Sequence, residues 1–445
     1  MKKVITYGTY DLFHYGHRRL LERAKALGDY LIVGVTSDDF DRARGKINVQ
    51  QSLMERLENV KQSGLADEVI VEEYEGQKID DIRRMNVDIF AIGSDWSGKF
   101  DYLKQYCQVI YLKRTKGISS TKIRSAESSL RIGLIGDTTL QEFKKYVDEC
   151  NVVNGVEVIG IYMDGDVDTS LGQTVYTDFD KLLTCCDAVY IASSPKQRYE
   201  QVKKALDMGK HVLCKSPIAL SKEKCKELFN LAASNHLILM DALKTAYAMA
   251  FNRLILLARG GKIGRILSID ATCTSLNESE KENGRKWNSI CTWGPVAMLP
   301  IFQLLGASYI EKQITSFFTK DNYDYDIFTK IDFLYPQAVA SIKVGRGFKS
   351  EGELIIGGTK GYIYVPAPWW KTDYYELRFE HSENNKRYFY QLDGEGIRYE
   401  IVAFLKSIMT GKNNTYVEEY VSEGIAGVIS DFYNRRDIKI ILSNE

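Results

Sequence analysis

Short apolar runs alternate with amphipathic helical patterns from the first residues of the chain, and this alternation constrains the fold more than any other feature. Within the first 125 residues, five runs are typical of buried strands, at 3–8, 30–37, 67–73, 87–94 and 108–115. Three stretches between them have helical spacing, at 16–27, 52–62 and 78–86. Strands that alternate with helices predict an α/β domain whose parallel, doubly wound sheet ends near Ser125.

The alternation restarts after the polar stretch SAESS at 125–129. Further strand-like runs at 131–136, 156–164, 187–194 and 210–215 predict a second parallel sheet with helices between its strands. From about Lys262 the strand signals crowd together, which predicts a largely antiparallel sheet, with a late helix at 398–411. We therefore expect three domains, at 1–125, 131–260 and 261–445.

The composition agrees with several domains and excludes some classes of partner. The chain has 445 residues, of which 44% are apolar, enough for two or three hydrophobic cores. A formal net charge of zero leaves no general basic excess, so we expect neither a nucleic acid nor a membrane surface as partner. Without a signal peptide or a membrane-spanning segment, and with eight scattered cysteines, we expect a cytoplasmic protein with reduced thiols.

The segment GTYDLFHYGH, residues 8–17, joins the first predicted strand to the first predicted helix and holds two of the five histidines. Ligands of parallel α/β sheets bind beyond the carboxyl ends of strands, where helix N-termini favour anions. Gly8 and Gly16 would let the backbone approach a phosphate, and His14 and His17 can both aim ring N–H donors into one small volume. The alternative is a pair of surface or helix-cap histidines; the strand-to-helix position favours the anion site.

A second polar cluster, LKRTKGISSTKIRS at 112–125, follows the last predicted strand of the same sheet. It carries Arg114, and the hydroxyls and exposed amides of Ser119, Ser120 and Thr121 also suit a phosphate. Taken alone, this cluster is typical of a solvated basic helix start. Because both loops open on one edge of the sheet, we expect them to form a single phosphate site.

Residues 1–125 resemble the glycerol-3-phosphate cytidylyltransferase family over the whole of that domain. The matching elements are GTYDLFHYGH, the region of Lys46, GSDWSGKFD at 93–101 and RTKGISST at 114–121. The resemblance implies transfer of a cytidylyl group from CTP to a polyol phosphate, glycerol 3-phosphate, for cell-surface polymer synthesis, with Mg²⁺ on the triphosphate. The stretch RARGKINVQQ departs from the lysine-rich loop that is typical of this family.

The same resemblance implies roles for individual side chains. His14 and His17 would stabilise charge that develops on the α-phosphate and the bridging oxygen, while Lys46 and Arg114 would neutralise phosphates. Asp11 would hold the loop or the acceptor. The other nucleotide-binding positions are Gly8, Thr9, Tyr10 and Gly16 in the first loop, Asp95 and Trp96 on the nucleotide side, and Ser119, Ser120 and Thr121 at the β- and γ-phosphates.

Residues 131–445 resemble the Gfo/Idh/MocA oxidoreductases, which have a Rossmann domain followed by an α+β open-sheet domain. The matching stretches are DAVYIASSP, ALDMGKHVLCKSPIALS and MDALKTAYAMAFNRL. The resemblance implies an NAD(P) site that involves Gly136, Asp164 and Lys215. Asp164 would take a ribose hydroxyl; the alternative is an ordinary loop aspartate.

The positions that would carry chemistry in this second half depart from the family pattern. The loop GLIGDTTLQEF keeps Gly136 but lacks a second glycine, and Asp137 would repel a pyrophosphate. Ser216 stands at the usual lysine position, and Thr292 and Val296 replace the proton-handling pair. We therefore expect NAD(P) to bind weakly or not at all, and dehydrogenase activity to be absent.

Two other interpretations of the second half stay open at this point. It could be a true oxidoreductase for a linked polyol or keto-sugar phosphate, which would make the chain bifunctional. It could instead be a non-catalytic binding and assembly module that makes the protein a homo-oligomer, as the open sheets of that family commonly do. Within DALKTAY, the nearly helical spacing of Asp241, Lys244 and Tyr247 indicates either a different site or pairing on a helix surface.

Overall fold

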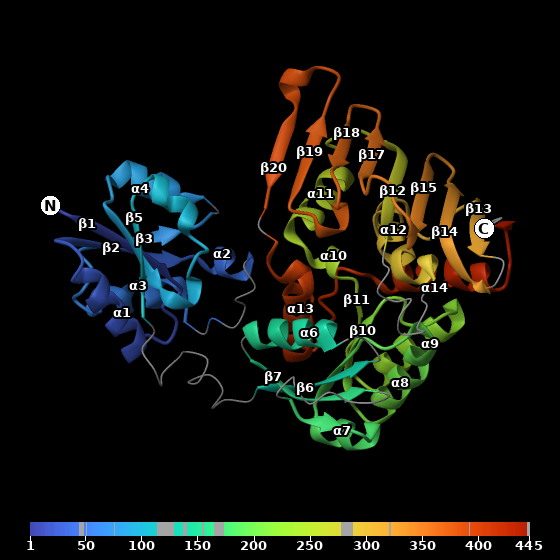
Figure 1. Cartoon of the computed structure of the whole chain (residues 1–445), viewed down its shortest axis with the longest axis horizontal. Helices are drawn as coiled ribbons and strands as arrows, with labels where there is room; N and C mark the ends of the chain where they lie inside the picture. The colour runs from blue at the N-terminus through green and yellow to red at the C-terminus, as the bar shows by residue number, and fades with distance from the viewer. Residues whose placement is uncertain are drawn as a thin grey trace. The chain divides into compact units, whose positions relative to one another are not determined.

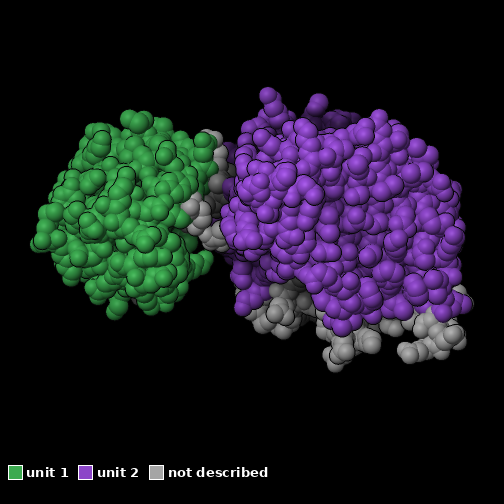
Figure 2. All heavy atoms as spheres, turned by 90° about the horizontal axis from the view of Figure 1, so that it is seen from above, with its two compact units in different colours: residues 1–129, 153–156 green, residues 130–152, 157–445 purple. Residues whose placement is uncertain are grey.

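The chain forms two compact units, residues 1–129 with 153–156 and residues 130–152 with 157–445 (Figure 2). The computed structural model describes residues 1–43, 49, 51–74, 76–113, 129–136, 140–153, 155–163, 173–276, 288–319, 322–390 and 392–442. Within these ranges, no helix combines the length and the apolar character that crossing a bilayer requires. All eight cysteines are free thiols.

The first unit is a five-stranded parallel sheet with the strand order β3-β2-β1-β4-β5 (Figure 1). Its strands are β1 (Lys3–Gly8), β2 (Tyr30–Thr36), β3 (Glu68–Glu72), β4 (Ile89–Gly93) and β5 (Gln108–Leu112). Its helices are α1 (Tyr15–Lys25), α2 (Asp38–Ala43), α3 (Leu53–Gln62) and α4 (Gln77–Met85), with short 3₁₀ turns η1 (Ser94–Trp96) and η2 (Asp101–Gln105).

Alternate side chains of the central strand point into two separate cores. Val4 on β1 packs in a cluster with Leu21 of α1 and Val60 of α3, on one face of the sheet. Ile5 packs on the other face with Ile82 of α4. Strands buried on both faces have continuous apolar runs, which is why these strands could be predicted from the sequence. The predicted α/β fold of this part is confirmed.

The second unit begins with a six-stranded Rossmann sheet in the order β11-β10-β9-β6-β7-β8. The strands are β6 (Leu130–Gly136), β7 (Val156–Met163), β8 (Val175–Tyr176), β9 (Ala188–Ile191), β10 (His211–Lys215) and β11 (Leu239–Ala242). The helices of this part are α6 (Leu140–Val152), α7 (Phe179–Cys185), α8 (Pro195–Asp207), α9 (Lys222–Ser234), α10 (Lys244–Tyr247) and α11 (Met249–Arg259). The predicted second parallel sheet is confirmed.

The second unit continues into a ten-stranded mixed sheet, in which most neighbours are antiparallel, but β12 pairs with β15, and β13 with β21, in parallel. This agrees with the predicted α+β open-sheet part. Its strands are β12 (Ile266–Leu276), β13 (Glu311–Thr319), β14 (Asn322–Leu334), β15 (Val339–Gly345), β16 (Gly347–Phe348), β17 (Leu354–Gly358), β18 (Tyr362–Val365), β19 (Tyr374–Arg378), β20 (Lys386–Phe389) and β21 (Ile438–Leu442). The helices are α12 (Ser289–Leu305), α13 (Ile397–Thr410) and α14 (Glu419–Tyr433), with 3₁₀ turns η4 (Trp369–Lys371), η5 (Ser382–Asn384) and η6 (Asp393–Gly396).

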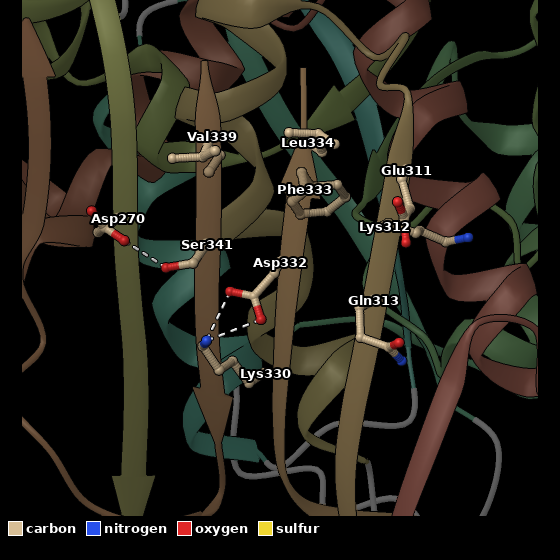
Figure 3. A pocket seen from close by; sticks show the side chains of 11 residues that line it. Asp270, Glu311, Lys312, Gln313, Lys330, Asp332, Phe333, Leu334, Val339 and Ser341 are labelled. Atoms are coloured by element: carbon tan, nitrogen blue, oxygen red, sulfur yellow. Dashed lines mark hydrogen bonds and ion pairs between the residues drawn. The ribbon is translucent and has the colours of Figure 1, made fainter. Parts of the chain in front are cut away.

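The two faces of this sheet differ. Helix α12 packs on β12, β14 and β15, and Ile331, Phe333 and Ile342 point into the core on that face. Side chains at alternate positions point to the opposite face, where a shallow hollow is lined by residues of β12, β13, β14 and β15 (Figure 3). There Ser341 donates to Asp270 at 2.6 Å, and Lys330 pairs with Asp332 at 2.8 Å.

Helix α13 connects the two parts of the second unit. It packs on α6 and β10 of the Rossmann sheet, while α14 packs on α9 and α12. Residues near the start of α13 therefore lie among the helices that flank the Rossmann strands (Figure 1).

Candidate functional site

The loop between β1 and α1 forms the first candidate site. β1 lies between β2 and β4 in the sheet, so the chain order reverses beside it. In open α/β sheets, ligands bind at such a switch point, beyond the carboxyl ends of the strands. Gly8 ends β1 at this edge, and the loop from Thr9 to His14 leads directly into the N-terminus of α1.

His14 is the N-cap of α1, and its contacts fix the orientation of its ring. Its Nδ1 accepts hydrogen bonds from the backbone N–H groups of Gly16 at 3.0 Å and His17 at 3.4 Å. Because Nδ1 accepts, the ring hydrogen is assigned to Nε2, which is then the donor. The His17 ring stacks on the His14 ring, with centroids 3.9 Å apart and planes 14° apart. The helix cap thus holds two imidazoles in parallel at a helix N-terminus, where an anion is favoured.

The backbone of this loop has an unusual conformation. Tyr10 and Leu12 have φ angles of 54° and 48°, in a region that residues other than glycine rarely adopt. Asp11 is buried and accepts from the backbone N–H of Gln51 at 3.0 Å, and the Gln51 side chain accepts from the N–H of Leu12 at 2.9 Å. Burial raises the pKa of the Tyr10 hydroxyl, which keeps that ring neutral. Asp11 therefore holds the loop in its strained form.

Arg56 of α3 is a further anchor of this loop, and no motif in the sequence pointed to it. Its side chain is fully buried. The guanidinium donates to the carbonyls of Thr9 and Thr36, each at 2.8 Å, and to that of Gln51 at 3.1 Å. It also pairs with Asp38 and Asp41. The guanidinium group has five N–H donors in a rigid planar arrangement, so it can bind all of these acceptors at once. Arg56 therefore fixes the start of the loop relative to β2 and α3.

Asp41 completes this anchor. Its two carboxylate oxygens accept from the hydroxyl of Thr9 at 3.0 Å and from that of Thr36 at 2.6 Å. Thr9 is thereby held through both its side chain and its carbonyl. Thr9 therefore positions the loop.

The remaining predicted residues of the first site lie in different places. Asp95 and Trp96 follow β4 in η1, at the same sheet edge as the histidine loop, because β1 and β4 are parallel neighbours. Asp95 is exposed, and Trp96 is half-buried against Phe100, with ring centroids 5.8 Å apart. The following predicted residues lie outside the described residues: Lys46, Arg114, Ser119, Ser120 and Thr121.

The switch point of the Rossmann sheet, between β6 and β9, forms the second candidate site. Gly136 ends β6, and a Cβ there would lie 3.0 Å from the ring of Phe143 on α6. The absence of a side chain thus lets α6 pack closely on the sheet. Asp137 and Asp164 lie outside the described residues.

Ser216, at the position where the Gfo/Idh/MocA pattern has a lysine, lies in the turn after β10. The Ser216 hydroxyl donates to the Asp241 carboxylate at 3.1 Å, and Ser422 of α14 donates to the same oxygen at 2.7 Å. Asp241 is only 1% exposed, and burial raises the pKa of its carboxyl to about 6. Lys215 extends its ammonium to 5.9 Å from the centroid of the Tyr146 ring. Ser216 therefore belongs to a buried hydrogen-bonded group that joins β10, β11 and α14.

The first two turns of α12 carry the other two replaced positions, Thr292 and Val296. Thr292 is exposed, and its hydroxyl lies 3.5 Å from a guanidinium nitrogen of the buried Arg346. Val296 is half-buried one turn later on the same helix. A hydroxyl and an isopropyl group do not exchange protons near neutral pH, so Thr292 and Val296 do not supply the acid–base pair that the family pattern has at these positions.

A buried acid lies between α13 and the Rossmann sheet. Glu400 is 1% exposed and accepts a hydrogen bond from the Tyr190 hydroxyl at 2.5 Å. Burial raises the pKa of this carboxyl to about 8, because the charged form is poorly solvated there. The sequence offered no signal for this pair, because the two residues are 210 positions apart.

Two family models match the chain. Residues 5–126 match the model described as cytidylyltransferase-like, and residues 130–242 match the model described as oxidoreductase family, NAD-binding Rossmann fold.

Within the described residues, no group of three or more His, Cys, Asp or Glu side chains is arranged to hold a metal ion.

Individual relatives resemble the two units separately. A glycerol-3-phosphate cytidylyltransferase of Bacillus spizizenii is 55% identical over 130 residues, which are 29% of this chain and 100% of the relative. The scyllo-inositol 2-dehydrogenase (NADP(+)) of Bacillus subtilis is 40% identical over 70 residues, which are 16% of this chain and 21% of that enzyme. The 3-ketoreductase KijD10 of Actinomadura kijaniata, solved with NADP, has a TM-score of 0.62 at 17% identity, covering 71% of this chain and 100% of that one. This last likeness shows the fold of the second unit.

Proposed function

Since the chain belongs to the cytidylyltransferase-like family and continues into a domain of the Gfo/Idh/MocA oxidoreductase family, we propose that its first unit transfers the cytidylyl group of CTP to glycerol 3-phosphate. The observation that carries this proposal is the 55% identity to a glycerol-3-phosphate cytidylyltransferase over that enzyme's full length. The paired histidines at the N-terminus of α1 support it, because they suit a triphosphate.

In the proposed reaction, a phosphate oxygen of glycerol 3-phosphate attacks the α-phosphorus of CTP. A new P–O bond forms, the bond from the α-phosphorus to the bridging oxygen breaks, and pyrophosphate leaves with the electron pair of that bond. The attacking group is already an anion, so the protein needs to supply alignment and charge stabilisation rather than a nucleophile. The products are CDP-glycerol, a building block for a cell-surface polymer, and pyrophosphate.

The histidines have distinct parts in this mechanism. The Nε2–H of His14 and the stacked ring of His17 donate to the α-phosphate and the bridging oxygen, where negative charge grows in the transition state. The cap bonds from Gly16 and His17 to Nδ1 keep the His14 donor aimed before substrate arrives. Arg56 and Asp11 act through the backbone of the loop and are positioning residues.

The other assignments of the proposal concern the nucleotide. Lys46 and Arg114 neutralise phosphates, Ser119, Ser120 and Thr121 bind the β- and γ-phosphates, and Asp95 and Trp96 contact the nucleoside. Mg²⁺ enters as part of the substrate, because this ion is commonly bound through substrate phosphates and retains several waters.

A pyrophosphate-release assay with the full-length protein, Mg²⁺ and CTP tests this proposal. We expect release with glycerol 3-phosphate, slower release with four- and five-carbon polyol phosphates, and none when ATP replaces CTP. Release with ATP but not CTP, or no release with any three- to five-carbon polyol phosphate, would contradict the proposal.

For the second unit, we propose a Rossmann domain that has lost dehydrogenase chemistry. Ser216 is committed to Asp241, and Thr292 and Val296 offer no acid–base pair. The rival is a bifunctional enzyme that also acts as an NAD(P)-dependent oxidoreductase on a linked polyol or keto-sugar phosphate. Substrate-dependent turnover of the nicotinamide would favour that rival.

We also propose that the outer face of the ten-stranded sheet mediates a homo-oligomer. Leu334 and Val339 are paired across β14 and β15 on this face and are 43% and 52% exposed, beside the charged side chains of the hollow (Figure 3). Light scattering after gel filtration should give a multiple of 50.7 kDa. A molar mass equal to that of a single chain at every micromolar concentration would contradict the proposed homo-oligomer.

A further inference from the structure

Three lysines from separate elements of the second unit converge on one carboxylate. Lys244 of α10 and Lys371 of η4 donate to Glu395 of η6 at 2.9 and 2.7 Å, and Lys145 of α6 forms a third ion pair with it. We call Lys145, Lys244 and Lys371 the lysine cluster. Lys244 is thus engaged with a residue 151 positions away rather than with a neighbour on its own helix.

The segment that carries Glu395 is strained. Glu395 has a φ of 53°, between Gly394 at 57° and Gly396 at 92°. A left-handed conformation costs a residue other than glycine on the order of 1 kcal/mol or more, and such strain is concentrated at functional sites and ligand clamps. The glycines are needed for close packing, since a Cβ on Gly394 would meet the carboxylate of Glu149, and one on Gly396 would lie 2.9 Å from the carbonyl oxygen of Lys244.

The charges of this cluster are unequal. Three ammonium groups, with nine N–H donors, share the two oxygens of one carboxylate. The nearby Arg398 is paired with Glu149 at 2.8 Å and does not alter the balance. The buried Glu400 is hydrogen-bonded to Tyr190, and burial raises the pKa of its carboxyl. The cluster therefore retains an excess of positive charge.

The lysine cluster is also accessible. The side chains of Lys145, Lys244 and Lys371 are 37%, 34% and 42% exposed, and that of Glu395 is 32% exposed. An incoming anion can therefore reach the ammonium groups if the Glu395 carboxylate moves aside. Relaxation of its left-handed backbone would favour that movement.

A tryptophan is adjacent to the lysine cluster in the sequence. Trp370 precedes Lys371 in η4, and its ring lies 4.8 Å from that of Trp293, centroid to centroid. The Thr245 hydroxyl, next to Lys244, donates to the Trp370 carbonyl at 2.9 Å and so ties α10 to η4. Both rings are half-buried. Indole faces stack with planar bases.

From this arrangement we propose that the lysine cluster is a binding site for the pyrophosphate of a nucleotide, in which Glu395 occupies the place of a phosphate in the absence of ligand. Two kinds of compound share this chemistry, a nucleoside diphosphate-linked polyol and a pyridine dinucleotide. The ligand is the nucleoside diphosphate-linked polyol, because the first unit makes that class of compound; this choice rests on the proposed function. The base stacks against Trp370, and the phosphates replace Glu395 at the ammonium groups.

Calorimetric titration of the full-length protein with CDP-glycerol tests this site, with variants that have opposite expected effects. Two classes of binding site are expected, one in each unit. K371A should weaken one class about tenfold or more. E395Q should tighten the same class severalfold, because it removes the carboxylate that competes with phosphate. K203A is the matched control, since Lys203 forms a comparably exposed ion pair with Glu227 at 2.7 Å, and it should change neither class.

The two variants separate ligand binding from a structural role. K371A removes one ion pair of the lysine cluster and E395Q removes all three, so a purely structural cluster would make both effects on binding equal in sign. The proposal would be overturned by a single class of CDP-glycerol site in the wild type, by CDP-glycerol affinities in K371A equal to those of the wild type, or by weaker CDP-glycerol binding in E395Q. NADPH binding that K371A weakens, without CDP-glycerol binding, would overturn the choice of ligand.

The same preparations distinguish this proposal from that for the first unit. Pyrophosphate release from CTP should be unchanged in K371A and E395Q, because neither residue belongs to the first unit. Binding uses added CDP-glycerol, so it can succeed even if the first unit makes another product.

Discussion

Replacement of Asp241 by asparagine should change how the stability of the second unit depends on pH. Burial raises the pKa of this carboxyl from 3.8 to about 6, against the lowering effect of hydrogen bonds from Ser422 and Ser216. Between these two values the native protein retains a proton that the unfolded chain has lost. The free energy of unfolding therefore falls as pH rises from about 4 to about 6, and stays at the lower value above that range.

The magnitude follows from the size of this change. A tenfold change in an acid dissociation constant corresponds to about 1.4 kcal/mol, so Asp241 should lower the free energy of unfolding by roughly 2–3 kcal/mol between pH 4 and pH 7. In D241N the side-chain oxygen can still accept from Ser216 and Ser422, but nothing titrates. Its amide N–H₂ would occupy the place of the carboxylate oxygen that has no hydrogen-bond partner, which costs about 1–3 kcal/mol at every pH. The quantity to measure is therefore how the difference in the free energy of unfolding between D241N and the wild type changes with pH.

Urea denaturation at pH 4 and pH 7, followed by tryptophan fluorescence, supplies this difference. Four of the five tryptophans belong to the second unit, so the signal mainly reports its unfolding. Relative to wild type, D241N should gain about 2–3 kcal/mol between pH 4 and pH 7. D187N is a control that should show almost no change between these pH values, because hydrogen bonds from Arg131 hold the pKa of Asp187 below 3.8, so its contribution is lost only below about pH 4. A D241N difference that is the same at both pH values would refute the reasoning.

Three further predictions concern the two candidate sites. H14A or H17A should lower the turnover number for CDP-glycerol formation by ~10²-fold or more, as expected for loss of a preorganised donor. The circular dichroism spectrum should remain unchanged. Near-normal turnover in both variants would show that the histidines act only as helix caps. R56M should destabilise the first unit by about 3–5 kcal/mol, because it removes the buried guanidinium that pairs with Asp38 and Asp41, and R56K should lose less; equal thermal midpoints for all three proteins would contradict the role of Arg56 as an anchor. Titration with NADH or NADPH, followed by nicotinamide fluorescence, should show no saturable binding in the low micromolar range, and such binding with substrate-dependent oxidation would restore the bifunctional interpretation.

The two parallel sheets could be predicted because their signals are local. β1 and β2 are buried on both faces, so their sequences are continuous apolar runs, and the helices between them have 3.6-residue spacing. Ser52 and Glu55 form a capping box at the start of α3, a contact that spans only three residues. The histidine loop could be singled out in the sequence for the same reason, since all of it lies within ten residues.

Elements that depend on distant residues could not be predicted in this way. Helix α12 contains Pro295 and Pro300, which local propensity reads as helix breakers, and its burial against the ten-stranded sheet overrides that signal. Strand β21 exists because it pairs in parallel with β13, more than a hundred residues earlier. Arg56 could not be recognised as an anchor for the same reason: its acceptor Thr9 is 47 positions away.

Two of the replaced positions in the second candidate site carry polar side chains with polar partners. Where proton transfer would need an acid and a base, Ser216 is hydrogen-bonded to Asp241, and Thr292 stands beside Arg346. Elsewhere in the second unit, Glu395 holds the lysine cluster from a strained backbone conformation. Three ammonium groups around one carboxylate can neutralise the charge of an added anion, as the proposed phosphate site requires.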